Sequence, residues 1–183
     1  MEHALDVHRS SGRPVTTRSL SLIAAALEKA GCRCLIVGGV AVVAHGYPRF
    51  TATVDVVLDP DPAAILRAIE ALSGLGYTPR APVPFAAFAD PAQRNRWAQE
   101  KQMLVFSVNS PSHSATEIDL FLETPFAFEA AWARALHETL DGVPFHIVGR
   151  DDLIALKRAA GRPRDLEDVA ALEALAREER RDG

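Results

Sequence analysis

The sequence predicts an α/β fold of the α+β kind, a mixed β-sheet flanked by helices with further helices at the C-terminal end. Three observations carry this prediction. Short β-branched runs alternate with segments of helical periodicity, a glycine pair joins one such run to a helix, and a turn dipeptide separates two late runs as in a hairpin. The 183 residues fit a single domain, 1–183, whose first segment, 1–14, is polar, aperiodic and expected to be flexible.

Composition is that of a globular protein, with 48% hydrophobic and 24% charged residues and a net charge of −4. The small net charge argues against a nucleic-acid footprint spread over the whole surface. No apolar run approaches the roughly 20 residues that span a bilayer, and residues 1–18 lack the apolar core of a signal peptide. We therefore expect a cytoplasmic protein without membrane contact. Cys32 and Cys34, the only cysteines, lack the further thiols of a zinc site and are interpreted as packing residues.

In the first half of the chain, helices and strands are expected to alternate. Thr16 or Thr17 caps the first helix, Gly31 ends it, and Asp61 precedes a proline at the first position of a later helix. The expected elements are a helix to residue 30, a strand over 34–37, a helix over 40–45, a strand over 51–58 and a helix over 62–72.

The second half begins with a proline-rich segment, 78–91, whose Phe85 and Phe88 are expected to pack a loop or short helix over the sheet. The dipeptide Asp141-Gly142 is typical of a type I′ hairpin turn. The other expected elements are a helix over 91–100, strands over 102–109 and 116–123 joined by a turn at 110–114, a helix over 126–136, hairpin strands over 137–140 and 143–148, and closing helices over 151–160 and 164–180.

The stretch from Ile36 to Pro60 is the part of the chain most indicative of function. A strand ends there in Gly38-Gly39, a helix follows, and Asp55 stands on the next strand. Glycines let an anion approach the backbone, and a helix N-terminus offers unpaired N–H groups and partial positive charge. A carboxylate on the neighbouring strand could hold a metal ion against a bound phosphate.

This stretch resembles the nucleotidyltransferase superfamily, in particular the small bacterial AbiEii-like nucleotidyltransferases of abortive-infection toxins. The resemblance covers 34–61 and returns at 118–120 and 152–168. The residues that carry it are Gly38-Gly39 with Ala41, then His45-Gly46, Pro48-Arg49 and Thr51, and then Asp55.

The resemblance implies a nucleotidyltransferase fold and transfer of a nucleoside monophosphate from an NTP to a hydroxyl of RNA (such as the tRNA 3′ end) or of a protein. It also implies a toxin–antitoxin or phage-defence role with a cognate antitoxin. Mg²⁺ or Mn²⁺ would be held by Asp55 and Asp119. These two acids and Lys157 would be the catalytic residues, and the nucleotide contacts would be Gly38, Gly39, Arg49, Thr53 and Lys157.

One position departs from the family pattern Arg-x-Thr-x-Asp-x-Asp. Thr53 stands where the first aspartate is expected, and a neutral hydroxyl is a weaker Mg²⁺ ligand than a carboxylate. Glu117, on the same face of its strand as Asp119, could compensate in part. The alternative hypothesis is a catalytically degenerate module that binds a nucleotide or a protein partner without turnover.

Strand alternation supports a site on one face of the sheet. It places Thr53 and Asp55 on one face and the apolar residues Ala52, Val54, Val56 and Leu58 on the other. If the two strands are neighbours, Asp55 and Asp119 can converge on one cation. Arg49 could contact phosphate or pair with an acid, and Asp165 and Asp168 are expected to tie down the closing helices by ion pairs.

Overall fold

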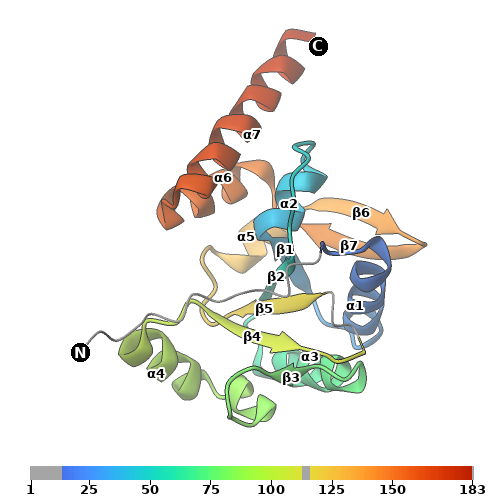
Figure 1. The fold of residues 1–183 in the computed structure, drawn as a ribbon, viewed down its shortest axis with the longest axis vertical. Coiled ribbons are helices and arrows are strands. Elements are labelled where there is room, and N and C mark those ends of the chain that lie inside the picture. The colour runs from blue at the N-terminus through green and yellow to red at the C-terminus, as the bar shows by residue number, and fades with distance from the viewer. Residues whose placement is uncertain (1–13, 113–115, 183) are drawn as a thin grey trace.

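The computed structural model describes residues 14–112 and 116–182, and these form one mixed sheet with helices around it (Figure 1). The strand order is β3-β4-β5-β2-β1-β7-β6. The predicted fold class is therefore confirmed. The expected flexibility of 1–14 falls almost wholly outside the described residues, as does part of the turn expected at 110–114.

The element bounds agree with the expected ones to within a few residues. The strands are β1 Cys34–Val37, β2 Thr53–Leu58, β3 Thr78–Pro79, β4 Val105–Asn109, β5 Glu117–Phe121, β6 Leu136–Leu140 and β7 Val143–Ile147. The helices are α1 Thr17–Lys29, α2 Gly38–Ala44, α3 Pro62–Gly74, α4 Pro91–Lys101, α5 Phe128–Ala133, α6 Arg150–Ala160 and α7 Pro163–Asp182, with a 3₁₀ helix, η1, over Phe85–Ala89.

Several boundaries differ from the expected ones; strand β4, for example, begins at Val105 and not at residue 102. Helix α2 begins at Gly38 itself and not at residue 40, and strand β2 begins at Thr53 and not at residue 51. Helix α5 ends at Ala133, before the expected residue 136, because Leu136 pairs with Ile147 at the start of the β6–β7 hairpin. The short edge strand β3, in the proline-rich segment, was not predicted.

The caps and turns form where the sequence places them. Thr16 Oγ1 accepts a hydrogen bond from the Ser19 N–H at the start of α1, and Asp61 accepts one from the Ala64 N–H at the start of α3. In the β6–β7 hairpin both Asp141 and Gly142 have positive φ, 51° and 78°, as a type I′ turn requires.

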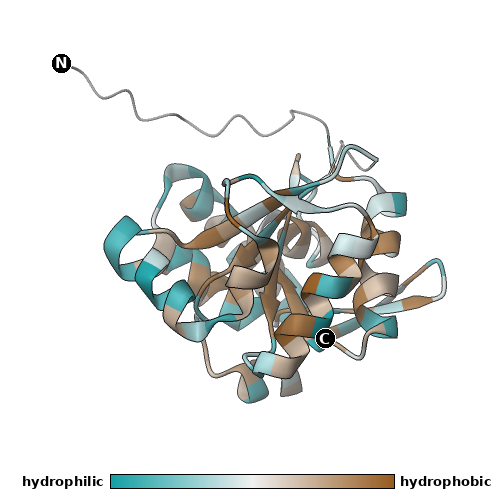
Figure 2. Ribbon diagram, turned by 90° about the horizontal axis from the view of Figure 1, so that it is seen from below, coloured by the Kyte–Doolittle hydropathy of each residue, from teal (hydrophilic) through white to brown (hydrophobic). Residues whose placement is uncertain are grey.

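Strand β2 lies near the middle of the sheet, antiparallel to β1 and parallel to β5. Its apolar residues Val54, Val56 and Leu58 are buried as expected, and Figure 2 shows the hydrophobic strands lying between helices with hydrophilic outer faces. Val57 is buried too, although it shares a face with Asp55. Only the first half of that face, at Thr53 and Asp55, remains partly open.

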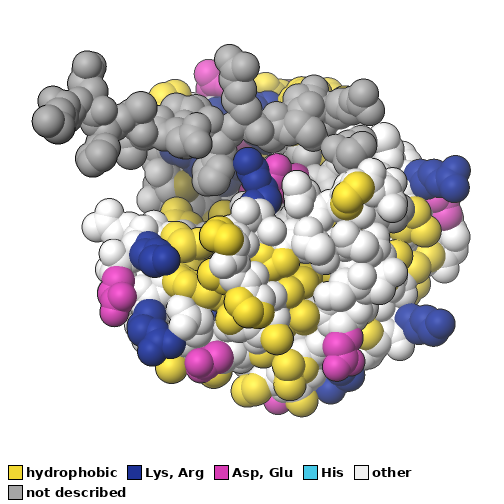
Figure 3. Space-filling model, turned by 60° about the horizontal axis from the view of Figure 1, so that its bottom comes forward, with side chains coloured by type: hydrophobic (Ala, Val, Ile, Leu, Met, Phe, Trp, Pro, Cys, Tyr) yellow, Lys and Arg dark blue, Asp and Glu magenta, His cyan; other side chains and the backbone are white. Residues whose placement is uncertain are grey.

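Helix α1 lies beside β7 and also packs against α3 (Figure 1). Helices α6 and α7 stand beside α2 at one end of the molecule, whereas α3 and α4 lie at the opposite end. Figure 3 shows hydrophobic side chains gathered on the face that carries α3 and η1, with charged side chains around its rim. Among the described residues, none of the helices has the combined length and apolar character needed to cross a bilayer.

Candidate active site

Both glycines at the β1–α2 junction are required by close contacts. Gly38 has φ +62°, and a Cβ added there would lie 2.1 Å from Asp55 Oδ2. A Cβ on Gly39 would lie 2.5 Å from Thr51 Oγ1 and 2.6 Å from an Arg49 guanidinium nitrogen. The backbone N–H of Gly39 favours the ionised form of the Asp55 carboxylate and so acts to lower its pKa. In this structure, the anion at the glycine turn is therefore Asp55 itself.

The structure brings Asp55 and Asp119 together across the parallel β2–β5 pair, where they are direct partners. Burial raises the pKa of Asp55 to about 6, and the charge of Asp119 adds to this rise. Lys157, the Gly39 N–H and Arg162 act in the opposite direction, but they do not outweigh burial and the second acid. The pair thus stores electrostatic repulsion that a bound cation would relieve.

A serine on the next strand contacts this pair. Ser107 on β4 is the cross-strand partner of Asp119 on β5, and its Oγ donates a hydrogen bond to Asp119 Oδ1 at 2.5 Å. Ser107, Asp119 and Asp55 therefore follow one another across three neighbouring strands. Sequence reasoning missed Ser107, because only the β4–β5 register shows which residue lies opposite Asp119.

Lys157 belongs to a buried ion-pair network. Its Nζ lies 3.1 Å from Asp165 Oδ1 and 2.7 Å from Asp168 Oδ2. Asp168 Oδ2 also contacts Arg49 at 2.7 Å, and Asp165 Oδ2 contacts Arg162 Nε at 2.6 Å. The two aspartates thus join α7 to α6 and to the loop before β2, which is the role expected for them.

Thr53 donates a long hydrogen bond, 3.4 Å, from its Oγ1 to Asp55 Oδ2. The residue paired with Thr53 on the neighbouring strand β5 is Glu117. Glu117 is buried and accepts a hydrogen bond from Arg80 at 2.8 Å. The acid that could have compensated for Thr53 is therefore held by an arginine.

A cleft of about 630 Å³ opens over the carboxylate pair. Its lining includes Gly38, Asp55, Asp119, Lys157, Arg162 and Asp165. Its other walls come from the end of α4 and the segment leading into β4 (Ala98, Gln99, Gln102, Met103, Leu104, Val105), from residues 121–125 after β5, and from Leu156, Ala159 and Ala160 of α6. The predicted contacts Gly39, Arg49 and Thr53 lie outside this lining. The α4–β4 wall and Arg162 were not predicted as site residues.

The donor set fits a cation that arrives with a nucleotide. Among the described residues, no group of three or more His, Cys, Asp or Glu side chains is placed to hold a metal ion. A closed protein cage is therefore not what Asp55 and Asp119 form. Mg²⁺ in phosphoryl-transfer sites is commonly held by one or two carboxylates, and substrate phosphates and water complete its octahedron. Two adjacent, mutually repelling carboxylates match that arrangement.

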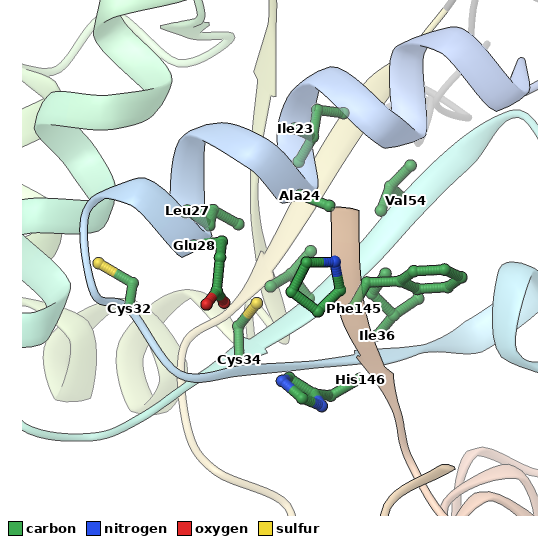
Figure 4. A pocket seen from close by; sticks show the side chains of 12 residues that line it. Ile23, Ala24, Leu27, Glu28, Cys32, Cys34, Ile36, Val54, Phe145 and His146 are labelled. Atoms are coloured by element: carbon green, nitrogen blue, oxygen red, sulfur yellow. The ribbon is translucent and has the colours of Figure 1, made fainter. Parts of the chain in front are cut away.

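The two cysteines lie away from this cleft, beside a small pocket between α1 and the sheet (Figure 4). Cys32 is buried, and burial raises the pKa of Cys34 to about 12, so its thiol stays protonated at neutral pH. The pocket has room for about 20 Å³, roughly one water molecule. The structure therefore agrees with the interpretation of the cysteines as packing residues.

Comparison with known proteins identifies the fold. No family model matches the chain, and no curated sequence does. The solved structure of the lincosamide antibiotic adenylyltransferase LnuA, bound to lincomycin, matches with a TM-score of 0.60 at 14% identity, covering 88% of this chain and 99% of LnuA. ANT(2'')-Ia in complex with adenylyl-2''-tobramycin matches with a TM-score of 0.53 at 14% identity, covering 91% of this chain and 98% of ANT(2'')-Ia. An antigenic nucleotidyltransferase-like protein from Paracoccidioides brasiliensis matches with a TM-score of 0.52 at 14% identity, covering 87% of this chain and 75% of that protein. The chain has the nucleotidyltransferase fold.

Proposed function

We propose that this protein is a metal-dependent nucleotidyltransferase that transfers a nucleoside monophosphate from an NTP to a hydroxyl group. The observation that carries the proposal is the pairing of Asp55 with Asp119 in a cleft of about 630 Å³ within this fold. Asp is disfavoured inside strands, and a mutually repelling pair is more unfavourable still. Such a pair is typical of a site that binds a cation.

Asp55 and Asp119 would hold Mg²⁺ or Mn²⁺. When bound, the cation supplies charge neutralisation at the triphosphate as negative charge develops around the α-phosphorus. One of the two carboxylates takes the proton of the acceptor hydroxyl, whose oxygen bonds to the α-phosphorus as the bond to pyrophosphate breaks. In this assignment Asp55 and Asp119 are the catalytic residues.

Lys157 and Arg162 have different roles at the phosphate end of the site. The Lys157 ammonium lies between two carboxylates, and its side chain is only 6% exposed. The Arg162 side chain is 77% exposed, contacts Asp165 through Nε, and lines the same cleft. We assign the direct triphosphate contact to Arg162, because a guanidinium binds phosphate through several donors. Lys157 contributes positive charge beside Asp55.

The other predicted nucleotide contacts position the catalytic side chains rather than contact the nucleotide. Gly38 lines the cleft and allows the close approach of Asp55. The Gly39 N–H favours the ionised Asp55 carboxylate, Thr53 donates a hydrogen bond to the same group, and Arg49 forms an ion pair with Asp168. We assign Gly39, Thr53 and Arg49 to positioning the carboxylates and the Lys157 network.

For the acceptor, the charge of the cleft favours a protein hydroxyl over RNA. The lining carries four acids, Asp55, Asp119, Glu123 and Asp165, against two bases, Lys157 and Arg162. RNA acceptors are held mainly by basic residues. Small hydroxyl compounds are a further class, since neighbouring structures carry lincomycin and adenylyl-2''-tobramycin. A toxin–antitoxin or phage-defence role, with a cognate antitoxin, rests on the AbiEii-like motif alone.

One observation favours a second candidate, a degenerate module that binds nucleotide or a protein partner without turnover. Thr53 offers a hydroxyl where the family pattern has a carboxylate, and Glu117, its partner across the strands, is engaged by Arg80. The cation then has two carboxylates in place of three.

Label transfer separates the two candidates. The protein is incubated with each α-labelled NTP, Mg²⁺ or Mn²⁺, and in turn bacterial RNA, bacterial protein, lincomycin and tobramycin. Asp55→Ala serves as the inactive variant, and Glu70→Ala, an exposed acid of α3, serves as the matched control. Acceptor label that Asp55→Ala abolishes and Glu70→Ala retains supports the enzyme and identifies the acceptor class.

The other outcomes decide against turnover. NTP binding without label on any acceptor favours the binding module. The absence of both NTP binding and label overturns the enzyme and the nucleotide-binding form of the module, and leaves only a module that binds a protein partner.

A further inference from the structure

We propose that Ser107 is a positioning residue for the carboxylate pair, acting through Asp119. Its hydroxyl would hold the Asp119 carboxylate in one orientation beside Asp55, and so set the geometry in which a cation is bound. This inference rests on the proposed function, since it concerns the same two acids, but it adds a residue from a third strand.

The register of three strands carries the inference. Ser107 of β4 is opposite Asp119 of β5, and Asp119 is opposite Asp55 of β2. Directly opposed residues point to the same face of a sheet, so the hydroxyl and both carboxylates lie in one row. The backbone of Ser107 is itself held, because its carbonyl oxygen accepts a hydrogen bond from the Arg80 N–H at 3.0 Å.

The hydrogen bond has the geometry of a strong contact. The distance from Ser107 Oγ to Asp119 Oδ1 is 2.5 Å, within the range of roughly 2.5–2.7 Å that is typical of a hydroxyl bound to a carboxylate. The torsion that turns a carboxylate about its Cβ–Cγ bond is broad and poorly fixed by its own rotamer preference. A donor at one oxygen removes that freedom, and the neighbouring Asp55 charge would otherwise push the group away.

Ser107 acts through Asp119 and not as a ligand. It is absent from the lining of the cleft, whereas Asp119 and Asp55 both belong to it. In metal sites, residues that hydrogen-bond to a metal ligand commonly fix the orientation of that ligand, and Ser107 stands in this relation to Asp119. The position also explains a serine inside a strand, where a β-branched or aromatic side chain packs better.

Binding of Mn²⁺ alone to the nucleotide-free protein tests the inference, with free Mn²⁺ followed by electron paramagnetic resonance. Ser107→Ala should weaken Mn²⁺ binding about 10-fold or more, as loss of a residue behind a metal ligand commonly does. Ser107→Thr keeps the hydroxyl and suits a strand, so its affinity should stay close to that of the unaltered protein. Ser110→Ala is the matched control, because Ser110 is buried just after β4 and its hydroxyl bonds to the Leu75 carbonyl, away from the acids.

Crystal structures of the metal-free protein and of Ser107→Ala give a second readout, which does not depend on metal binding or turnover. The Asp119 carboxylate should be turned from its position in the unaltered protein. An unchanged Asp119 orientation together with unchanged Mn²⁺ affinity would overturn the role of Ser107 and leave the proposed function standing. If Asp55→Ala binds Mn²⁺ as tightly as the unaltered protein, the metal site of the proposed function is wrong, and the orientation of Asp119 alone then decides on Ser107.

Discussion

Asp55 and Asp119 are direct partners on two parallel strands, so their carboxylates project side by side at the same level of the sheet. Their sequence positions are more than sixty residues apart, and nothing local brings them together. Because burial and the charge of Asp119 both disfavour the ionised form of Asp55, this carboxylate costs the folded protein stability.

Asp55→Asn should stabilise the protein at neutral and alkaline pH. The folded-state pKa of Asp55 is raised from 3.8 to about 6, so between these values the folded protein holds a proton that the unfolded chain has lost. Stability of the unaltered protein therefore falls as pH rises through this window and levels off above it. We expect a gain of about 1–2 kcal/mol in the variant above pH 7, reduced from a full two-unit shift because the side chain is partly exposed. Urea unfolding from about pH 4 to pH 8 checks this. The same pH slope in both proteins would contradict it.

Gly38→Ala should destabilise the fold and displace Asp55. The new Cβ would lie 2.1 Å from Asp55 Oδ2, and the backbone at φ +62° is unfavourable for alanine. We expect a loss of at least about 2 kcal/mol in unfolding free energy, together with weaker Mn²⁺ binding. Gly74→Ala is the control, because its Cβ would meet nothing within 4 Å and it ends helix α3, where alanine is favoured. Equal unfolding free energies for the two variants would show that Gly38 is not under constraint.

Asp168→Ala should be among the most destabilising single changes at the site. The aspartate side chain is 2% exposed and contacts both Arg49 and Lys157 at 2.7 Å. Its loss leaves two cations without this shared partner in a buried setting, which typically costs about 3–5 kcal/mol. Glu173→Ala removes an exposed pairing with Arg158 and should cost about 1 kcal/mol or less. Thermal or urea unfolding of both variants makes the comparison, and a cost for Asp168→Ala as small as that for Glu173→Ala would argue against a structural network.

Thr53→Asp should make the site more dependent on a cation. The new carboxylate would lie beside Asp55 and opposite Glu117, so without metal the variant should be less stable than the unaltered protein. Mn²⁺ should bind more tightly and raise its melting temperature more, because ligand binding to the folded state adds to stability. Any transferase activity should rise, since a third carboxylate completes the family pattern. Unchanged affinity and activity would mean that Thr53 does not occupy the position of the family's first aspartate.

Local features of the sequence were sufficient to predict most elements. The Thr16 cap, the proline after Asp61 and the Asp141-Gly142 turn form as expected, because each depends on contacts between residues close in the chain. The proline-rich segment before α4 could not be assigned from its sequence. Its strand β3 is only two residues long and is defined by pairing with β4, which no local pattern reveals.

Only part of the candidate site was predicted, because some of its contacts join residues far apart in the chain. The cleft is lined by four of the predicted residues, Gly38, Asp55, Asp119 and Lys157. Arg49 instead forms an ion pair with Asp168, and Thr53 lies outside the lining. Ser107 and Arg162 were not singled out as site residues. A serine in a strand carries no pattern of its own, and only its neighbours in space give Ser107 a role. Arg162 belongs to the family resemblance over 152–168, but its place in the cleft is visible only in the structure.

The sequence by itself determined the order of helices and strands, the glycine turn and the face of β2 that carries Asp55, because capping, backbone conformation and side-chain alternation act over a few residues. Only the tertiary structure decided that Ser107, Asp119 and Asp55 form one row, that Lys157 lies between Asp165 and Asp168, and that burial raises the pKa of Asp55. These properties depend on the register of strands and the packing of helices far apart in the chain, and on the exclusion of water that this packing produces.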